Sequence, residues 1–65
     1  MITISERKAS IEHFDSLVSV SETAMIFLLF HKQLRIFGNN LRITLYTKDE
    51  VWIEGEIRQV IIDEH

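Results

Sequence analysis

Three residues that lie close together in the sequence have the side-chain types that a hydrolytic site needs. His13, Asp15 and Ser16 are the types found in a nucleophilic triad, where a base activates a hydroxyl group and an acid orients the base. Residues 12–16, however, are typical of a strand that ends in a turn, where Asp and Ser bond nearby backbone groups. A chain of 65 residues also has few residues with which to enclose a substrate pocket. We therefore expect no catalytic residues at this place.

Two glutamates offer a second kind of acid–base chemistry. Glu54 and Glu56 are two positions apart, so a strand would present both carboxylates on one face, as in the carboxylate pair of a glycosidase. Trp52 and Arg58 share that face, and the pattern is far more typical of a solvated strand surface. We expect a protein that is not an enzyme.

Metal and cofactor chemistry has little support in the sequence. The three histidines, His13, His31 and His65, have neither zinc-finger spacing nor helical spacing. The two glycines lie seventeen positions apart, which excludes a glycine-rich phosphate loop. We expect no metal site and no cofactor.

Nucleic-acid binding is the main alternative function. A small OB-like barrel could stack bases on aromatic side chains, here Phe27, Phe37, Tyr46 and Trp52. Ten acidic residues against seven basic ones give a net charge of −3, which opposes binding to phosphates. We therefore favour a protein that binds no nucleic acid.

The elements that must position these residues are strands. The apolar residues include ten Ile, six Leu, four Val and four Phe but only two Ala, a composition that suits pleated, half-buried surfaces. Several segments also alternate with period two. We predict one all-β domain over residues 1–65, a small sandwich or partly closed barrel of six or seven short, mostly antiparallel strands. The predicted strands are residues 2–5, 8–13, 17–22, 24–31, 33–38, 41–47 and 51–62.

A hairpin turn is predicted between two of these strands. Leu34 and Ile36 are even-numbered, whereas Leu41, Ile43 and Leu45 are odd-numbered, so a regular pairing with all five inward needs an even number of loop residues. The two-residue loop Asn39-Asn40 satisfies this, with Gly38 at the strand end and Ile36 opposite Ile43. A three-residue loop from Gly38 to Asn40 would need a bulge, and both forms remain open.

A bend is predicted in the last strand. Val51, Ile53, Gly55 and Ile57 share one face, and a glycine without a side chain to pack suits a bend or bulge. Beyond it, residues 60–62 are apolar on both faces. This segment either changes face or is covered on both sides.

A surplus of apolar side chains points to association. Residues 24–30 are apolar on both faces, which indicates either a central strand of a closed barrel or sandwich, or a subunit interface. A domain of this size has a thin stability margin and no cysteine for a disulfide, so oligomerisation is the stabilising device left. We predict a homo-oligomer, with a dimer favoured. The candidate interface residues are Ile26, Leu28, Phe30, Val60 and Ile62.

The chain shows no membrane or export signal. Its longest apolar run, residues 24–30, is seven residues, whereas a spanning helix needs about 20. The N-terminus has no basic region followed by an apolar stretch. We expect a cytoplasmic protein without direct membrane insertion.

Two motifs and their spacing resemble a known family. They are Leu34-x-Ile36-x-Gly38-x-x-Leu41 and Ile53-Glu54-Gly55-x-Ile57. With the strand pattern from Ile4 onward, they resemble the YabP/YqfC family of sporulation proteins, particularly its YqfC-like branch.

The resemblance implies a non-enzymatic protein of endospore assembly in the mother-cell compartment of a spore-forming bacterium. It also implies a membrane-embedded sporulation protein as a partner. It supplies no catalytic or cofactor-binding residues.

Overall fold

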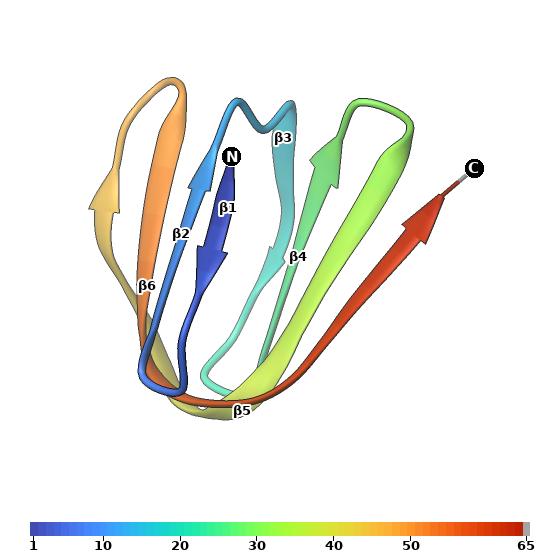
Figure 1. Ribbon diagram of the computed structural model, residues 1–65. Coiled ribbons are helices and arrows are strands. Elements are labelled where there is room, and N and C mark those ends of the chain that lie inside the picture. The colour runs from blue at the N-terminus through green and yellow to red at the C-terminus, as the bar shows by residue number, and fades with distance from the viewer. Residues whose placement is uncertain (65) are drawn as a thin grey trace.

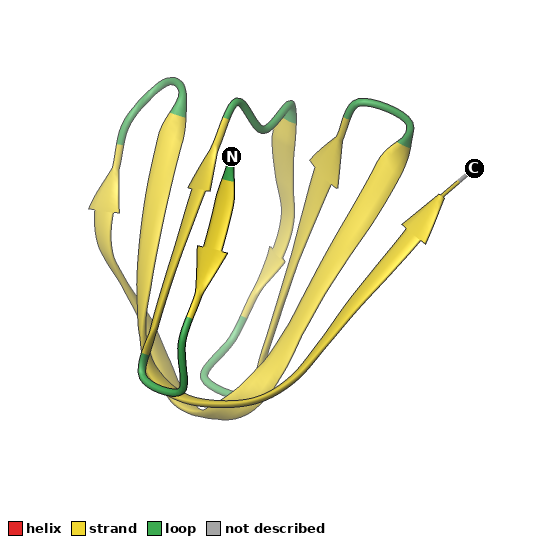
Figure 2. Cartoon of the chain, in the orientation of Figure 1, coloured by secondary structure: helices red, strands yellow, loops and turns green. Residues whose placement is uncertain are grey.

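The computed structural model describes residues 1–64, which form six antiparallel strands in one sheet without a helix. The strands are β1 (Ile2–Ile4), β2 (Lys8–Glu12), β3 (Ser16–Val20), β4 (Ala24–Leu29), β5 (Lys32–Tyr46) and β6 (Glu50–Glu64). Their order in the sheet is β1-β2-β6-β5-β4-β3 (Figures 1 and 2). The predicted all-β class is confirmed, as a folded sheet that does not close into a barrel. Within the described range, no helix has the length and apolar character needed to cross a membrane.

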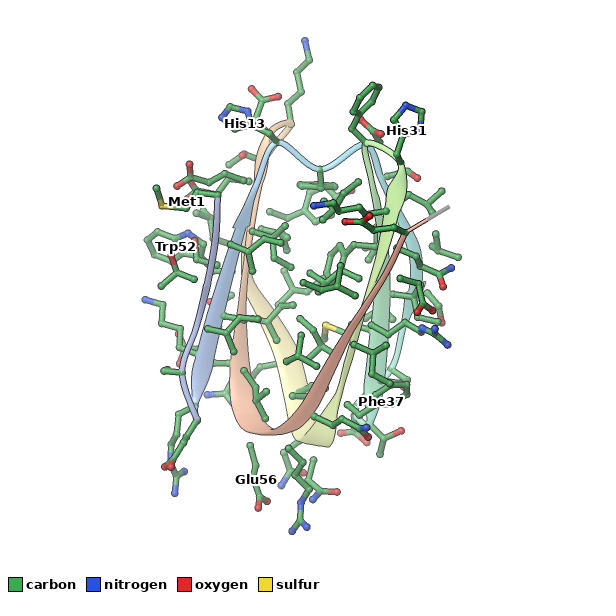
Figure 3. The ribbon with its side chains drawn as sticks, turned by 45° about the vertical axis from the view of Figure 1, so that its right-hand side comes forward. Met1, His13, His31, Phe37, Trp52 and Glu56 are labelled. Atoms are coloured by element: carbon green, nitrogen blue, oxygen red, sulfur yellow. The ribbon has the colours of Figure 1, made fainter. Side chains whose placement is uncertain are left out.

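The two longest strands fold the sheet over on itself. β5 and β6 each span fifteen residues and curve through the bottom of the molecule in Figure 1. The first layer contains β1, β2, residues 50–55 of β6 and residues 41–46 of β5. The second layer contains β3, β4, residues 32–38 of β5 and residues 57–64 of β6. The inner faces of the layers enclose the core (Figure 3).

The curvature comes from bulges and glycines where β5 and β6 cross from one layer to the other. Asn40 and Leu41 together lie opposite the single residue Gly55, and Asn40 has a φ of 54°. Gly55 has a φ of 142°, and a Cβ there would lie 2.6 Å from the Asn40 carbonyl oxygen. A Cβ at Gly38 would collide with the Glu56 carbonyl oxygen. Such bulges bend a strand and increase its twist.

The hairpin predicted at Asn39-Asn40 is wrong, in both its two-residue and three-residue forms. Residues 32–46 form one continuous strand, with Ile36 opposite Val60 and Ile43 opposite Ile53. Inward-facing residues are even-numbered before Asn40 and odd-numbered after it, and this change led to the prediction of a turn. The change is instead produced by a bulge, in which Asn40 and Leu41 lie opposite the single residue Gly55. Gly38, Asn39 and Asn40 therefore lie in the bend of β5, and Gly55 lies in the bend of β6.

A second register shift between β5 and β6 turns Leu45, which was predicted to face inward, to the outside of the sheet. The pairing shifts between Ile43 and Leu45, so Leu45 lies opposite Trp52 on the outer face. Tyr46 takes the inward position and meets the Phe14 ring edge to face, with the ring centroids 5.9 Å apart. The prediction that Leu45 faces inward is wrong because of this shift.

The core is shared by both layers. Its buried residues are Ala9, Ile11, Phe14, Met25, Phe27, Leu34, Ile36, Leu41, Val51 and Ile53. Burying an aliphatic or aromatic side chain of this size contributes roughly 1.5–3 kcal/mol, which makes the interior the main stabilising feature. Phe14 comes from the β2–β3 connection, so the segment that links the layers also fills the space between them.

The two layers are built on one repeated unit. Residues 2–12 and 18–28 each form a strand, a Ser-Glu-x turn and a second strand. The Ser5 hydroxyl accepts a hydrogen bond from the Lys8 N–H (3.2 Å), and the Ser21 hydroxyl accepts one from the Ala24 N–H (3.0 Å).

The turns of both units also bond the long strands in the same way. The Gly55 N–H donates to the Arg7 carbonyl (3.1 Å), and the Gly38 N–H donates to the Thr23 carbonyl (3.0 Å). Each residue of 8–12 thus has a counterpart sixteen positions later in β4, and each residue of 50–55 has one seventeen positions earlier in β5.

Candidate interaction surface

An apolar face covers the outside of the second layer. We call it the apolar outer face, and it consists of Ala24, Ile26, Leu28, Phe37 and Ile61. The strand register aligns Ile26, Arg35 and Ile61 in one row across β4, β5 and β6. Leu28 is 37% exposed at its border. Alternation places these side chains opposite to the core residues of the same strands.

An ion pair lies within the apolar outer face. Arg35 extends from the middle of the Ile26–Arg35–Ile61 row and pairs with Asp63 of β6. Both side chains are partly shielded, and the Arg35 Nε atom is buried with no hydrogen-bond partner among the described residues. An arginine stem that lies over apolar surface keeps its charged end at a fixed place. The face therefore combines apolar area with an oriented charge pair.

The outside of the first layer has a different character. The counterparts of Ala24, Ile26 and Leu28 are Lys8, Ser10 and Glu12. The Lys8 ammonium lies 4.3 Å from the centre of the Trp52 ring, a cation–π contact. A shallow hollow of about 310 Å³ beside this ring is lined by Thr3, Ser5, Lys8, Ser10 and Trp52. This surface therefore carries polar and charged residues where the second layer has Ala24, Ile26 and Leu28, and its apolar area is contributed mainly by Trp52 and Leu45.

A second apolar area lies at the end of the molecule that carries the β4–β5 turn. A hollow of about 340 Å³ there is lined by Met1, Ile2, Glu12, His13, Leu29, Phe30, Lys32 and Ile62. Phe30 is 76% exposed and lies against the ring of His31, with the centroids 4.0 Å apart. Ile62 is 50% exposed at the inner edge of β6. The two layers therefore leave part of the interior open at this end.

The five predicted interface residues do not share one face. Ile26 and Leu28 lie on the apolar outer face, and Phe30 lies in the β4–β5 turn. Val60 and Ile62 lie opposite Ile36 and Leu34, on the inner side of the sheet. The structure therefore divides the five residues among the apolar outer face, the β4–β5 turn and the inner side of β6, and their contact with a second chain stays a prediction.

The physical reason is an irregularity in β6. Ile57 lies opposite Gly38 and Gln59 lies opposite Phe37, so Arg58 is an extra residue that reverses the alternation beyond it. Ile61 turns outward as a result, and sequence reasoning missed it because no residue type marks such a bulge. Phe37 was also missed, although its position between inward-facing even residues gave a usable signal.

The residues considered for hydrolysis serve the architecture. The His13 N–H donates to the Asp49 carbonyl (2.7 Å), and the Asp15 N–H donates to the Leu28 carbonyl (2.8 Å), which ties the β2–β3 connection to both layers. Within residues 1–64, no hydrogen bond joins the side chains of His13, Asp15 and Ser16.

The two glutamates are held by separate arginines. Glu54 lies on the outer face with its carboxylate 3.8 Å from Arg42, and Glu56 lies at the bend 3.1 Å from Arg58. No group of three His, Asp or Glu side chains among the described residues is placed to hold a metal ion.

A third hollow, larger than the two described above, lies at the bend and has mixed charge. It measures about 600 Å³ and is lined by Glu6, Arg7, Asn40, Arg42, Gly55, Glu56 and Ile57. Two acidic and two basic side chains contribute to its walls, so the hollow selects neither an anion nor a cation.

The four aromatic residues considered for base stacking are dispersed. Phe27 is fully buried and Tyr46 packs against Phe14. Trp52 and Phe37 lie on the outsides of different layers (Figure 3). The structure does not bring the four rings together on one surface. The apolar outer face and the adjoining edge of β6 remain the strongest candidates for a functional surface.

Comparisons with known proteins give no match to this chain among family models, curated proteins or solved structures.

Proposed function

We propose that the protein is a non-enzymatic interaction module of endospore assembly that associates with a second copy of itself. The observation that carries the proposal is the contrast between the layers. The second layer has Ala24 and Ile26, both half-buried, and the exposed Leu28 on its outer face, where the first layer has Lys8, Ser10 and Glu12. Apolar side chains gathered on one outer face of a small domain are typical of a contact surface.

The sporulation part of the proposal is supported by the resemblance to the YqfC-like proteins. The two motifs that carry it, residues 34–41 and 53–57, contain Gly38 and Gly55, which allow the close backbone approaches at the bend. In this proposal the protein acts in the cytoplasm of the mother cell, and its apolar outer face binds a membrane-embedded sporulation protein.

The self-association is tested by replacing apolar residues on the outer face of the second layer with polar ones, as found at the counterpart positions of the first layer. The triple variant Ile26→Ser, Leu28→Glu, Ile61→Thr removes three apolar side chains from the second layer. The matched control is Ser10→Thr, a polar exchange at the first-layer counterpart of Ile26. Light scattering coupled to size-exclusion chromatography should give a dimer for the unmodified chain and the control, and a weaker dimer for the triple variant.

An unmodified chain that is strictly monomeric would contradict the self-association, and a triple variant that associates as tightly as the control would show that the apolar outer face takes no part in it. Circular dichroism checks that the triple variant keeps its sheet. The role in sporulation is tested by deleting the gene in the organism that encodes it and counting heat-resistant spores. We expect a loss of resistant spores that the control restores and the triple variant does not.

A further inference from the structure

The second half of β6 has an open edge. Residues 57–64 pair with β5 on one side, and no strand of the described residues 1–64 pairs with them on the other. Figure 1 shows this segment at the border of the sheet. Unpaired N–H and C=O groups along such an edge form a template for another strand. The edge is therefore a ready site for backbone pairing.

The other outer strands are poorer templates. β1 has three residues, and β3 has a register shift between Leu17 and Ser19 that interrupts its edge. Residues 41–46 of β5 contain the shift between Ile43 and Leu45. Short strands and bulges are devices that prevent edge pairing, whereas the edge of β6 has regular pairing from Gln59 to Glu64.

The edge also has an ordered distribution of side chains. Its middle is apolar at Val60, Ile61 and Ile62. A basic residue, Arg58, precedes this middle, and an acidic residue, Glu64, ends the strand. An antiparallel copy of the same strand would bring the basic end of one chain to the acidic end of the other. The edge is thus complementary in charge to itself.

Only a few registers are compatible with two identical antiparallel edges. Residues that lie directly opposite each other in an antiparallel pair share a face of the sheet. A two-fold axis that keeps the outer faces of both copies on the same side must therefore place one residue opposite its own copy. With Val60 on the axis, Arg58 would lie opposite Ile62. With Ile62 on the axis, Val60 would lie opposite Glu64. Both registers place a charge against an apolar side chain.

Between residues 58 and 64, the register centred on Ile61 places no charged side chain opposite an apolar one. Ile61 faces its own copy, Val60 faces Ile62, and Arg58 faces Glu64. In the single chain Glu64 pairs with Lys32 at 3.6 Å and Arg58 pairs with Glu56 at 3.1 Å, and the Glu64 and Arg58 side chains are 72% and 65% exposed, so the contact with a second chain would replace two solvent-exposed ion pairs. Cross-strand pairs of like polarity and opposite charge are the ones that stabilise a sheet.

We infer that two copies of this chain pair along the edges of β6, antiparallel, with Ile61 on the two-fold axis. This inference rests on the proposed self-association and specifies its geometry. The outer row Ile26–Arg35–Ile61 continues into the same row of the second copy. On the inner side Ile62, now half exposed, gains Val60 of the second copy as a neighbour. The apolar outer face then extends over both copies as one surface for a further partner.

A cysteine at the axis tests the register directly. The chain has no cysteine, so one introduced thiol reports one position. Opposed residues in an antiparallel pair have Cα atoms roughly 4.5–5.5 Å apart, within the range of a disulfide. Ile61→Cys should form linked dimers at least about tenfold faster than Ser10→Cys, an outward position in the first layer, because pairing raises the effective concentration.

Two further positions distinguish the register from its neighbours. Gln59 and Asp63 lie opposite each other in the inferred pairing, and neither lies opposite itself. A mixture of Gln59→Cys and Asp63→Cys chains should therefore form mixed disulfides much faster than either variant alone. Rapid self-linking of Gln59→Cys would overturn the inferred register.

The outcomes separate this inference from the proposed function. If the unmodified chain is dimeric but Ile26→Cys links rapidly while Ile61→Cys does not, the dimer uses the flat face and the edge inference is overturned. The proposed self-association would stand in that case. If the unmodified chain stays monomeric at every concentration, the proposed self-association fails and the inference fails with it.

Charge reversal provides an independent test. Arg58→Glu places two like charges opposite each other at both ends of the pairing and should weaken dimerisation about five- to tenfold. Glu64→Arg should have a similar effect. The double variant restores opposite charges and should recover most of the dimer affinity, measured by sedimentation. A double variant that is no better than the single ones would contradict the inferred contact.

Discussion

The two layers of this protein share a backbone plan but differ on their outer surfaces. Their turns begin with Ser5 or Ser21, and their long strands bend at Gly55 or Gly38. At counterpart inner positions both layers are apolar, as with Ile11 and Phe27. At the counterpart outer positions of β2 and β4, the first layer has polar residues and the second layer has apolar ones. Because the first layer reaches the same fold with Lys8, Ser10 and Glu12 at these positions, the fold does not require apolar side chains there.

Removing core counterparts should have the largest effect and should affect both layers. Phe27→Ala is expected to cost about 3–5 kcal/mol and Ile11→Ala about 2–5 kcal/mol, because each leaves a cavity between the layers. Stabilities of small domains are near the low end of roughly 5–15 kcal/mol, so either variant should be largely unfolded or close to it. Urea denaturation followed by circular dichroism measures both. If one variant unfolds while its counterpart loses less than about 1 kcal/mol, the layers do not share one core.

Substitution of the bend glycines should follow in size. Gly38→Ala forces a Cβ into the Glu56 carbonyl, and Gly55→Ala forces one toward the Asn40 carbonyl at a φ that L-residues rarely adopt. We expect each to cost on the order of 2–3 kcal/mol in urea denaturation at one protein concentration. Glu54→Ala, one residue before Gly55 in the same strand, is the matched control and should cost well below 1 kcal/mol. A control as damaging as Gly55→Ala would remove the special role of the bend.

Loss of a turn hydroxyl should have a smaller and equal effect in the two units. Ser5→Ala and Ser21→Ala each remove a hydrogen bond to the N–H three residues later, at 3.2 Å and 3.0 Å. Each should cost about 0.5–1.5 kcal/mol. Thermal unfolding of both variants gives the comparison. A clear cost at Ser21 with none at Ser5 would show that the units are alike in shape but not in energetics.

Exchange of outer residues between the layers should change stability least. Ile26→Ser and Ser10→Ile should each alter the free energy of unfolding by less than about 1 kcal/mol, because both positions face outward. Binding of a fluorescent apolar dye should decrease for Ile26→Ser and increase for Ser10→Ile. An unchanged dye signal in both would show that this face is not an accessible apolar surface.

The strand content could be predicted from the sequence because alternation and branched side chains are local signals. The odd inward set Val51 and Ile53 and the even inward set Leu34 and Ile36 both pack in the core as their alternation indicates. The places where the prediction failed are bulges, at Asn40, between Ile43 and Leu45, and at Arg58. A bulge reverses inward and outward positions without any fixed residue type, so a parity argument reads it as a turn or misses it.

Only some residues of the candidate surface could be predicted from the sequence. Ile26 and Leu28 lie on the outer face because β4 alternates regularly. Ile61 was missed, and the sequence left the orientation of Val60 and Ile62 open, since it depends on the extra residue at Arg58. The open edge of β6 depends on strand order in space, which short-range patterns do not contain.

The central claim is that a second copy of this chain covers part of the second layer. Sedimentation equilibrium of the unmodified chain, from roughly 1 µM to several hundred micromolar, tests it most directly, because a dimer of micromolar affinity changes its mass across that range. The account predicts a single monomer–dimer equilibrium that approaches twice the monomer mass. A mass that stays at one chain up to the highest concentration would contradict it.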